Sequence, residues 1–476
     1  MDKLKVKQKT VFFFMSEILA FIILVLMKAD PTVSFILLLW FWIIWYAIDD
    51  INNRILLFMF SVSFFNFLLG REILEHVFKY QVEDFPADVE THAKIMLLLS
   101  LTVLLFSYLF FSKYNFKRRE QLRDFKPTYN VVRIRSISQK LYYFTIVIAI
   151  AYNIVMGYFT LAFGYYGTYT DVAISTIYNN FAIYTIEKIN QMMPVFLALF
   201  LATVPSHSQT KRVSSLYFLY LLTSLLSGQR AKFVIGLLWI IIYYVYRNNT
   251  SDEKWISKQF VALGVLMLPA AILMLSLLSQ IREGNGIDSI KIIMGIPDYF
   301  YQQGVSVNVI KRAYEFAYRL NSDHLYSMSV ITDGVIGRIL GFARFSGNSV
   351  IHAEEGYSLA HALSYVMLGD GYLLGRGTGS SYIAELYHDF EYIGVIIGNI
   401  VYGYLISRSL TIRPDKFYIN AMALLVIRQL LWSPRGGFSD FLLVLLQPFT
   451  IFAFLIVMVL SQLTKNKYTD RMKYNG

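Results

Sequence analysis

The chain has 476 residues, of which 56% are hydrophobic and only 16% are charged. Soluble globular domains carry about 25% charged residues, so this composition excludes an ordinary soluble enzyme and a disordered chain. The sequence contains no cysteine, which excludes disulfides, thiolate metal sites and thiol nucleophiles. The formal net charge of +11 could indicate nucleic-acid binding. However, the basic residues gather in loops between apolar stretches, and we expect no nucleic-acid partner.

Apolar stretches long enough to cross a bilayer recur along the whole chain. A membrane-spanning helix needs about 20 mostly apolar residues, and this criterion predicts an all-α polytopic membrane protein with about twelve spans. The spans are expected near residues 10–27, 32–48, 55–70, 94–112, 141–163, 189–204, 213–228, 231–246, 259–279, 383–407, 417–433 and 440–461. The first stretch has no small-residue cleavage site, so it is not interpreted as a signal peptide.

Basic and acidic loops alternate between the predicted spans. The amino terminus, the loop at 113–140 and the carboxyl-terminal tail are rich in lysine and arginine, whereas the loop at 71–93 is acidic. The positive-inside rule therefore predicts that both termini lie in the cytoplasm. An even number of spans agrees with this orientation.

The longest interspan segment, about residues 280–382, is expected outside the cytoplasm. Apolar residues at helical spacing from Val309 to Leu320 and from Leu359 to Val366 indicate that it is folded. Long ordered loops usually carry function. The chain is therefore divided into residues 1–279 with nine spans, an external domain at 280–382, and residues 383–476 with three spans and a cytoplasmic tail.

Four arginines at the outer ends of spans are candidate ligands for an anion. Arg230 and Arg435 lie in tight external turns, and Arg282 follows the ninth span. Arg428 lies about two helical turns inside the eleventh span. Guanidinium groups near lipid are costly and point to function, and their planar forks bind phosphate oxygens. These arginines are predicted to bind a phosphate or pyrophosphate. The alternative is that each one snorkels, caps a helix or pairs with a carboxylate such as Asp440.

A glycine run, made up of Gly375, Gly377 and Gly379, precedes the tenth span. Its glycines allow close approach of the backbone, and Arg376, Gly377 and Gly379 are predicted to bind substrate. The run lacks the Gly-Lys-Ser/Thr of a phosphate-binding P-loop, and an ordinary turn into a helix is the alternative. Glu385 and His388, three residues apart, share a face of the helix that follows. We predict a catalytic role for Glu385 and a binding role for His388, although carboxylates are also ordinary partners of a helix amino terminus.

His361 is the second predicted catalytic residue. It lies on an amphipathic stretch, with Ser364 and Tyr365 on the same side. Because an imidazole titrates near neutral pH, it is the usual proton shuttle; a structural hydrogen bond is the alternative. The chain has no spacing typical of metal ligands, so neither a metal nor a cofactor is expected.

Several short motifs stand out together in this chain. They are Leu374–Tyr387, Tyr392–Gly398, Ser227–Arg230, His361 ahead of the glycine run, and Pro434–Asp440. These motifs resemble those of the bacterial Wzy-type polysaccharide polymerases. The many-span layout with one large, late external loop is also similar to that family.

The resemblance implies an integral-membrane glycosyltransferase of the GT-C type, related to O-antigen ligases. Such an enzyme moves a growing glycan from undecaprenyl pyrophosphate onto another undecaprenyl-pyrophosphate-linked repeat unit, building O-antigen, capsule or exopolysaccharide. The reaction takes place at the outer face of the bacterial cytoplasmic membrane. The arginines would hold the pyrophosphate leaving group, and His361 or Glu385 would accept the proton of the acceptor hydroxyl. A chain-length regulator in the membrane could be a further partner.

Two other functions stay open from the sequence. One is an O-antigen-type ligase with the same donor and a different acceptor, and the other is a flippase or transporter for the lipid-linked glycan. A transporter should carry charges at mid-membrane and interrupted helices in both halves. The polar residues here gather at one face and late in the chain, and no repeat is found. The sequence therefore favours the polymerase.

Overall fold

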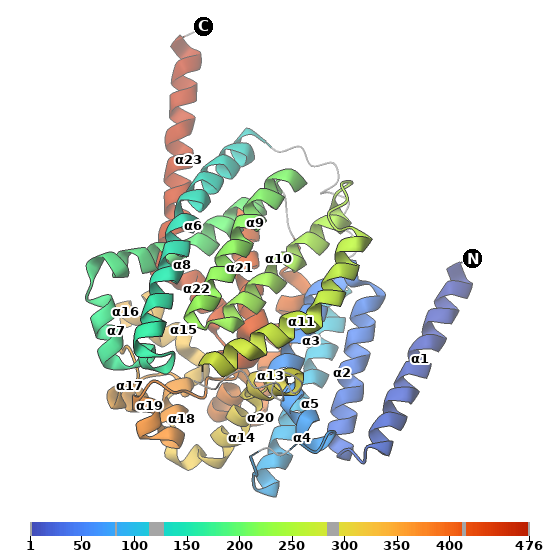
Figure 1. Ribbon diagram of the computed structural model, residues 1–476. Coiled ribbons are helices and arrows are strands. Elements are labelled where there is room, and N and C mark those ends of the chain that lie inside the picture. Colours follow the sequence, from blue (N-terminus) through green and yellow to red (C-terminus); the bar gives the residue numbers. More distant parts are fainter. Residues whose placement is uncertain (1, 81–82, 114–127, 283–294, 412–415, 475–476) are drawn as a thin grey trace.

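The protein is described by a computed structural model that covers residues 2–80, 83–113, 128–282, 295–411 and 416–474 (Figure 1). Within these ranges the regular elements are helices, together with one isolated β-bridge between Thr170 and Asn348. The predicted all-helical class is therefore confirmed. Residues 114–127 of the predicted basic loop lie outside the described residues.

A helix underlies each of the predicted spans. In chain order these helices are α1 (Asp2–Leu26), α2 (Pro31–Asp49), α3 (Ile51–Phe64) continued by a π-helical turn (Phe65–Leu69) and α4 (Gly70–His76), α5 (Ala87–Ser112), α6 (Tyr129–Phe163), α8 (Phe181–Ala202), α9 (His207–Ser224), α10 (Arg230–Thr250), α11 (Lys258–Arg282), α20 (Tyr382–Arg408), α21 (Phe417–Trp432), and α22 (Asp440–Leu446) followed by α23 (Pro448–Tyr474). By length and apolar composition, five helices in the described residues can cross a membrane, or six if the bent pair α22 and α23 is one span. The fold is thus that of a multi-pass membrane protein, and the number twelve stays a prediction.

Local sequence explains where several of these helices begin and end. Asp30 accepts hydrogen bonds from the backbone N–H groups of Thr32 and Val33, and Pro31 occupies the first turn of α2. A short 3-10 turn (Leu225–Ser227) extends α9 and ends at Gly228, whose φ of +73° suits glycine. Because the chain reverses there, α10 begins directly at Arg230.

The core lies between the central helices and is apolar. The run of α8 from Val195 to Ala202 is entirely buried, and α8 packs against α6 and α21. The outer sides of the bundle carry large exposed hydrophobic residues instead, such as Phe144 and Leu161 of α6 and Leu266 of α11. Apolar side chains on the outside as well as the inside are typical of a bundle whose solvent is lipid.

Residues 295–381 form a cap of short helices at the lower end of the bundle in Figure 1. Its helices are α13 (Gly295–Gln303), α14 (Ser306–Glu315), α15 (Ser329–Thr332), α16 (Gly334–Leu340), α17 (Val350–Glu355), α18 (Leu359–Leu368) and α19 (Asp370–Leu373). The two predicted amphipathic stretches are confirmed as α14 and α18, except that α14 ends at Glu315 and a separate 3-10 turn covers Ala317–Arg319. The connection between α6 and α8 contains a 3-10 turn (Tyr166–Tyr169) and α7 (Asp171–Tyr178).

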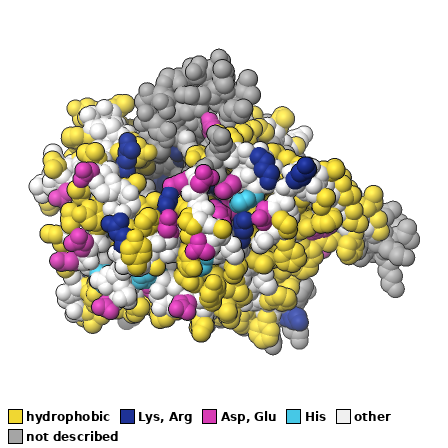
Figure 2. All heavy atoms as spheres, turned by 90° about the horizontal axis from the view of Figure 1, so that it is seen from below, with side chains coloured by type: hydrophobic (Ala, Val, Ile, Leu, Met, Phe, Trp, Pro, Cys, Tyr) yellow, Lys and Arg dark blue, Asp and Glu magenta, His cyan; other side chains and the backbone are white. Residues whose placement is uncertain are grey.

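The two ends of the bundle differ in character. The described beginning of α1 and end of α23 both point away from the cap (Figure 1). Viewed from the cap side, acidic, basic and histidine side chains gather across the middle of the face, and hydrophobic ones dominate toward one edge (Figure 2). Charged and histidine side chains of the described surface therefore gather on the cap face.

Candidate functional site

Arg230 approaches the cap from the first turn of α10. Its side chain is buried, and Nη1 donates to the carbonyl oxygen of Leu275 in α11 at 3.0 Å. Nη1 and Nη2 also lie 3.3 and 3.4 Å from Oε1 of Gln302 in α13. Arg230 therefore links α10, α11 and the cap.

Arg435, which follows α21 near the carboxyl-terminal end of the chain, contacts the same cap helix, α13. It lies in the 3-10 turn that follows α21 (Ser433–Arg435) and donates to the carbonyl oxygen of Gln303 at 3.4 Å. Burial raises the pKa of the Tyr299 hydroxyl, and the positive charges of Arg230 and Arg435 both oppose this effect. Both arginines thus contact α13, Arg230 at Gln302 and Arg435 at the carbonyl oxygen of Gln303. We call Arg230 and Arg435 the arginine pair.

The other two predicted arginines are placed differently. Arg428 is half-buried in α21, and its charge acts on Lys232 of α10. Lys232 donates to Oδ1 of Asn153 at 3.4 Å, and its ammonium group lies 4.7 Å from the ring centre of Tyr220. Arg428 of α21 and Lys232 of α10 are thus a second pair of basic residues. Arg282 is the last residue of α11, and its side chain lies outside the described part.

Glu385 holds the turn that carries Arg435. Its Oε1 accepts a hydrogen bond from the Ser380 hydroxyl at 2.6 Å, and its Oε2 accepts one from the backbone N–H of Phe438 at 2.8 Å. A Cβ atom at Gly437 would lie 3.3 Å from the same Oε2, so a glycine gives the carboxylate room. Glu385 is only 4% exposed. Its contacts are those of a group that ties the start of α20 to the arginine-bearing turn.

His388 has a similar place one turn further along α20. Its Nδ1 lies 2.9 Å from Oδ1 of Asp389, whose carboxylate accepts hydrogen bonds from the backbone N–H groups of Tyr326 and Ser327. The His388 ring also packs against Tyr326, with ring centres 4.8 Å apart. These contacts fasten the cap to α20.

His361 lies in α18 and forms a stacked pair with His352 of α17. The ring centres are 3.6 Å apart, and Nδ1 of His361 lies 2.8 Å from the Tyr372 hydroxyl. Burial lowers the pKa of His361 to about 3, and the charge of His352 acts in the same direction. Burial also lowers the pKa of His352. Burial therefore favours the uncharged form of both imidazoles.

The glycine run packs against α18 and the connection between α6 and α8. Gly375 has φ +90°, and a side chain there would clash with the carbonyl oxygen of Tyr166. The backbone N–H of Thr378 donates to Oγ of Ser364 at 2.9 Å. The predicted close approach of backbone is thus observed, and the surface approached is the protein itself.

A cavity of about 670 Å³ opens beside the glycine run. Two of the predicted binding residues, Arg376 and Gly377, line it, whereas Gly379 is not part of its lining. The cavity also contains two arginines that the sequence reasoning did not select. The polar residues of the lining are Arg71, Glu83, Asn308, Arg312, Arg376 and Thr378.

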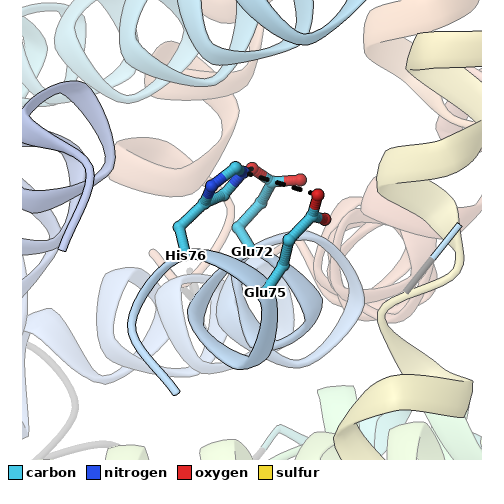
Figure 3. Close-up of side chains that lie close together, drawn as sticks. All are labelled: Glu72, Glu75 and His76. Atoms are coloured by element: carbon cyan, nitrogen blue, oxygen red, sulfur yellow. Dashed lines mark ion pairs between the residues drawn. The ribbon is translucent and has the colours of Figure 1, made fainter. Parts of the chain in front are cut away.

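An ionic cluster fastens the cap to α4 and α5 next to this cavity. Glu72, Glu75 and His76 project from one side of α4 (Figure 3). Nζ of Lys311 in α14 lies 2.8 Å from Glu72 and 2.7 Å from Glu90 of α5. His76 Nε2 lies 3.4 Å from Glu72 and 3.6 Å from Glu90. We call these five residues the ionic cluster.

Lys311 compensates the carboxylates of this cluster. Its side chain has no exposed surface. Burial by itself would lower its pKa, but the charges of Glu72, Glu90 and Glu75 outweigh that effect and raise the pKa. Ligand atoms of Glu72, Glu75 and His76 lie within 4.8 Å of one another, so by distance they could also hold a metal ion. The ammonium group already supplies a cation to the same oxygens.

The sequence analysis did not select four basic residues in these groups, namely Arg71, Lys232, Lys311 and Arg312. Arg71 belongs to the 71–93 segment, whose charges were interpreted only as a sign of membrane topology. Lys232 comes two residues after Arg230, and that spacing was the available signal. Lys311 lies between Ile310 and Arg312, off the predicted apolar stripe, so the pattern indicated a solvent-exposed side chain.

Comparison with known protein families shows which family the chain belongs to. The sequence model of the family described as O-antigen polysaccharide polymerase Wzy matches residues 9–467. The chain belongs to this family. It is therefore a membrane enzyme that polymerises lipid-linked repeat units in polysaccharide biosynthesis. The resemblance read from short motifs is confirmed over nearly the whole chain, and polymerisation is supported over the ligase and flippase alternatives. No curated protein and no solved structure matches the chain.

Proposed function

We propose that this polymerase joins undecaprenyl-pyrophosphate-linked repeat units at the outer face of the bacterial cytoplasmic membrane, as a GT-C-type glycosyltransferase. In this proposal the chain crosses the membrane twelve times, both termini are cytoplasmic, and residues 280–382 form the external domain. The alternation of basic and acidic loops supports this orientation. Both described ends of the chain lie on the side away from the cap, which agrees with an even number of spans (Figure 1).

The arginine pair is proposed to hold the pyrophosphate of the donor. The observation that supports this proposal is that two guanidinium groups, one from α10 and one from the turn after α21, contact the same cap helix α13 at Gln302 and Gln303. Pyrophosphate gains negative charge as the bond to the anomeric carbon breaks. Fixed cations at that point stabilise the transition state more than the ground state. Arg428 with Lys232 would extend the same positive field. Arg282, whose side chain lies outside the described part, stays a predicted phosphate ligand.

Glu385 and His388 are proposed to act by positioning. The enclosed carboxylate of Glu385 holds the turn of Arg435 through Phe438, and His388 with Asp389 holds the cap. The residues beside the glycine run, Arg376, Gly377 and Gly379, are proposed to contact the glycan.

His361 is proposed to accept the proton of the acceptor hydroxyl. Its imidazole is neutral, which is the form that accepts a proton. A pKa of about 3 makes it a weak base, however. The role therefore requires that a bound anion raise the pKa. His361→Ala should then slow chain growth by about 10²–10⁴-fold and leave donor binding intact. An unchanged rate would remove His361 from the mechanism.

The function is tested by deleting the gene and examining the glycans. Cells lacking the protein should export single repeat units and form no ladder of longer chains. Repeat units that remain on the cytoplasmic side would indicate a flippase. Chains of normal length that fail to reach their final acceptor would indicate a ligase. A chain-length regulator, if one acts here, should change the length distribution and not the ability to polymerise.

The orientation is tested with reporter fusions. Fusions after residues 125, 210 and 470 should be cytoplasmic, and fusions near residues 85 and 330 should be external. A cytoplasmic reporter at 330 would move the arginine pair to the wrong side for this donor and would contradict the proposal.

A further inference from the structure

The cap side of the bundle carries an exposed apolar surface around α7 and α16. Leu161 at the end of α6, Phe181 at the start of α8 and Ile339 of α16 are 88%, 81% and 77% exposed. Helices α7 and α16 lie at the left edge of the molecule in Figure 1. The chain links their surroundings directly, because the backbone N–H of Asn348 donates to the carbonyl oxygen of Tyr169. We call this surface the apolar edge.

The apolar edge continues onto a helix of the bundle. Val172 of α7 and Leu340 of α16 add further exposed hydrophobic side chains to it. Phe452 of α23, which lines a cavity together with Arg338 of α16, is 54% exposed. Exposed hydrophobic residues that gather in one place mark an interaction surface. Because this one adjoins a predicted span, we infer that the bilayer leaflet on the cap side covers it.

The cavity in this surface has a volume of about 280 Å³ and a cationic rim. Lys188 of α8, Arg338 and Arg344 line it, and the lining contains no carboxylate among the described residues. Lys188 pairs with Glu187 at 2.8 Å, and the charge of Arg344 acts on Asp333. Arg338 forms no ion pair with a carboxylate in the described part of the chain. An anion from outside would complete this set of charges.

The remaining wall of the cavity is largely apolar. Met192 of α8 and Phe449 and Phe452 of α23 contribute to it. The bent pair α22 and α23 changes direction by 49° around Gln447, which lines the same cavity. A break in a span is tolerated where the backbone lines a cavity or is enclosed by protein. The cavity therefore offers cations and an amide to a polar head, and aromatic surface to an apolar chain.

We propose that this cavity binds the headgroup of an anionic phospholipid from the cap-side leaflet, with the phosphate at Arg338 and Arg344 and the acyl chains along Phe449 and Phe452. Guanidinium groups bind phosphate oxygens through their planar forks, and basic pockets between membrane helices bind anionic headgroups. Together with the apolar edge, the lipid seats this part of the cap in the membrane.

The proposed lipid site is separate from the elements that hold the arginine pair. In the described structure its lining includes no residue of α10, α11, α13 or the glycine run. It lies among α8, α16 and the bend between α22 and α23. The inference therefore goes beyond the proposed function and does not depend on it.

The test measures lipid binding to the purified full-length protein by native mass spectrometry after delipidation in detergent. Phosphatidylglycerol should bind at one site about tenfold more tightly than phosphatidylcholine with the same acyl chains, the gain of one charge-assisted contact. Arg338→Gln changes an exposed residue and should abolish this preference. The matched control is Arg319→Gln, an exposed arginine of the cap outside the cavity, which should retain it. Equal binding of both lipids by the wild type, or an unchanged preference in Arg338→Gln and in Arg344→Gln, overturns the proposal.

Two competitors identify the source of the phosphate. Glycerol 3-phosphate has no acyl chains and should displace labelled phosphatidylglycerol much less effectively than unlabelled phosphatidylglycerol does. Equal competition would mean that the cavity recognises phosphate alone, which contradicts the assignment to a lipid. Farnesyl pyrophosphate should also be the weaker competitor. If it displaces the lipid more effectively than phosphatidylglycerol does, the cavity belongs to a polyprenyl pyrophosphate and the proposal is wrong.

A spin label tests whether the apolar edge lies in the bilayer. The chain contains no cysteine, so Ile339→Cys introduces a single labelling position. In vesicles of phosphatidylglycerol and phosphatidylethanolamine, the label should be more accessible to oxygen than to a water-soluble nickel complex. The control is Tyr318→Cys, at a residue of the cap that is 81% exposed, where the nickel complex should dominate. A water-accessible label at residue 339 overturns the membrane seat of the apolar edge.

Discussion

Adjacent residues of α14 belong to two regions with opposite balances of charge. Lys311 points into the ionic cluster, where the carboxylates of Glu72 and Glu90 lie within 2.8 Å of its ammonium group. Arg312 lines the cavity, where three guanidinium groups face the single carboxylate of Glu83. The cluster contains three carboxylates around two cations, Lys311 and His76, and hydrogen bonds to Glu72 and Glu90 outweigh the effect of burial and raise the pKa of His76 to about 9. The lining of the cavity contains an excess of cations.

The difference separates structural charges from charges suited to a ligand. A buried charge is tolerated when a partner of opposite sign meets it, and in the ionic cluster the protein supplies both signs. In the cavity it supplies mainly one, so an anion from outside would complete the set. From this charge balance we expect the cluster to hold the cap and the cavity, which Arg376 and Gly377 line, to contact the substrate.

The largest effect on stability is expected when the buried Lys311 is replaced. Lys311→Met would leave buried carboxylates without their cation, which costs about 3–5 kcal/mol of unfolding free energy. Thermal unfolding of the purified protein in detergent should show a markedly lower midpoint. Adding Glu72→Gln to Lys311→Met removes one of the stranded charges and should restore part of the loss. A single variant as stable as the wild type would show that the cluster does not hold the cap.

Replacing either residue of the arginine pair should reduce activity and not stability. Arg230→Ala or Arg435→Ala removes a charge-assisted contact worth about 1.5–3 kcal/mol. The expected loss in kcat/KM for repeat units is therefore about 10- to 150-fold. Replacement by Lys should restore activity only in part, because a point charge cannot form the bidentate fork.

Arg319→Ala serves as the matched control for these two variants. Arg319 is an exposed arginine in the 3-10 turn after α14, and its loss should leave the rate nearly unchanged. Wild-type rates in both pair variants would mean that these arginines only anchor the helices.

The low pKa of His361, which stacks on His352, should make the stability of the protein depend on pH. The pKa of His361 is about 3 in the folded protein and about 6.5 in an unfolded chain. Between these values the unfolded state binds more protons, so the free energy of unfolding decreases as pH falls from about 6.5 toward 3. The slope from one such group is at most about 1.4 kcal/mol per pH unit.

His361→Gln should reduce this acid sensitivity, as measured by unfolding midpoints across the same pH range. An unaltered slope in the variant would mean that His361 titrates normally in the folded protein.

Chelation should have the smallest effect. The oxygens of Glu72 and Glu75 already interact with Lys311, so a metal ion would have to compete with a buried ammonium group. Chain growth by the purified protein should therefore proceed at an unchanged rate in EDTA. A strict requirement for an added divalent ion would place a metal in this cluster or elsewhere in the mechanism.

The sequence predicted the elements of the fold well and their packing poorly. Apolar runs of about 20 residues identify membrane helices because lipid requires every backbone group to be paired within the helix. The helices α14 and α18 were equally visible from periodic apolar residues. The course of residues 164–180, which pack on the cap through Gly375 and Asn348, had no such signal because it depends on contacts distant in the sequence.

The candidate site was predictable only as a set of residue types. The unusual positions of Arg230 and Arg435 near lipid made them candidates, and in the structure both contact α13. The enclosure of Glu385 and the low pKa of His361 could not be predicted, since both follow from burial by other elements. Arg71 and Lys311 looked like ordinary loop and surface charges, and only the packing of α4 against the cap gives them their roles.

The most direct test of this division measures the growth rate per folded molecule and the unfolding midpoint on the same preparations of Lys311→Met and Arg435→Ala. We predict that Lys311→Met unfolds at a much lower temperature while the molecules that remain folded extend chains at close to the wild-type rate. Arg435→Ala should unfold near the wild-type midpoint and extend chains about 10- to 150-fold more slowly. If both variants instead lose activity only in proportion to the stability they lose, the separation of structural charges from substrate-binding charges is wrong.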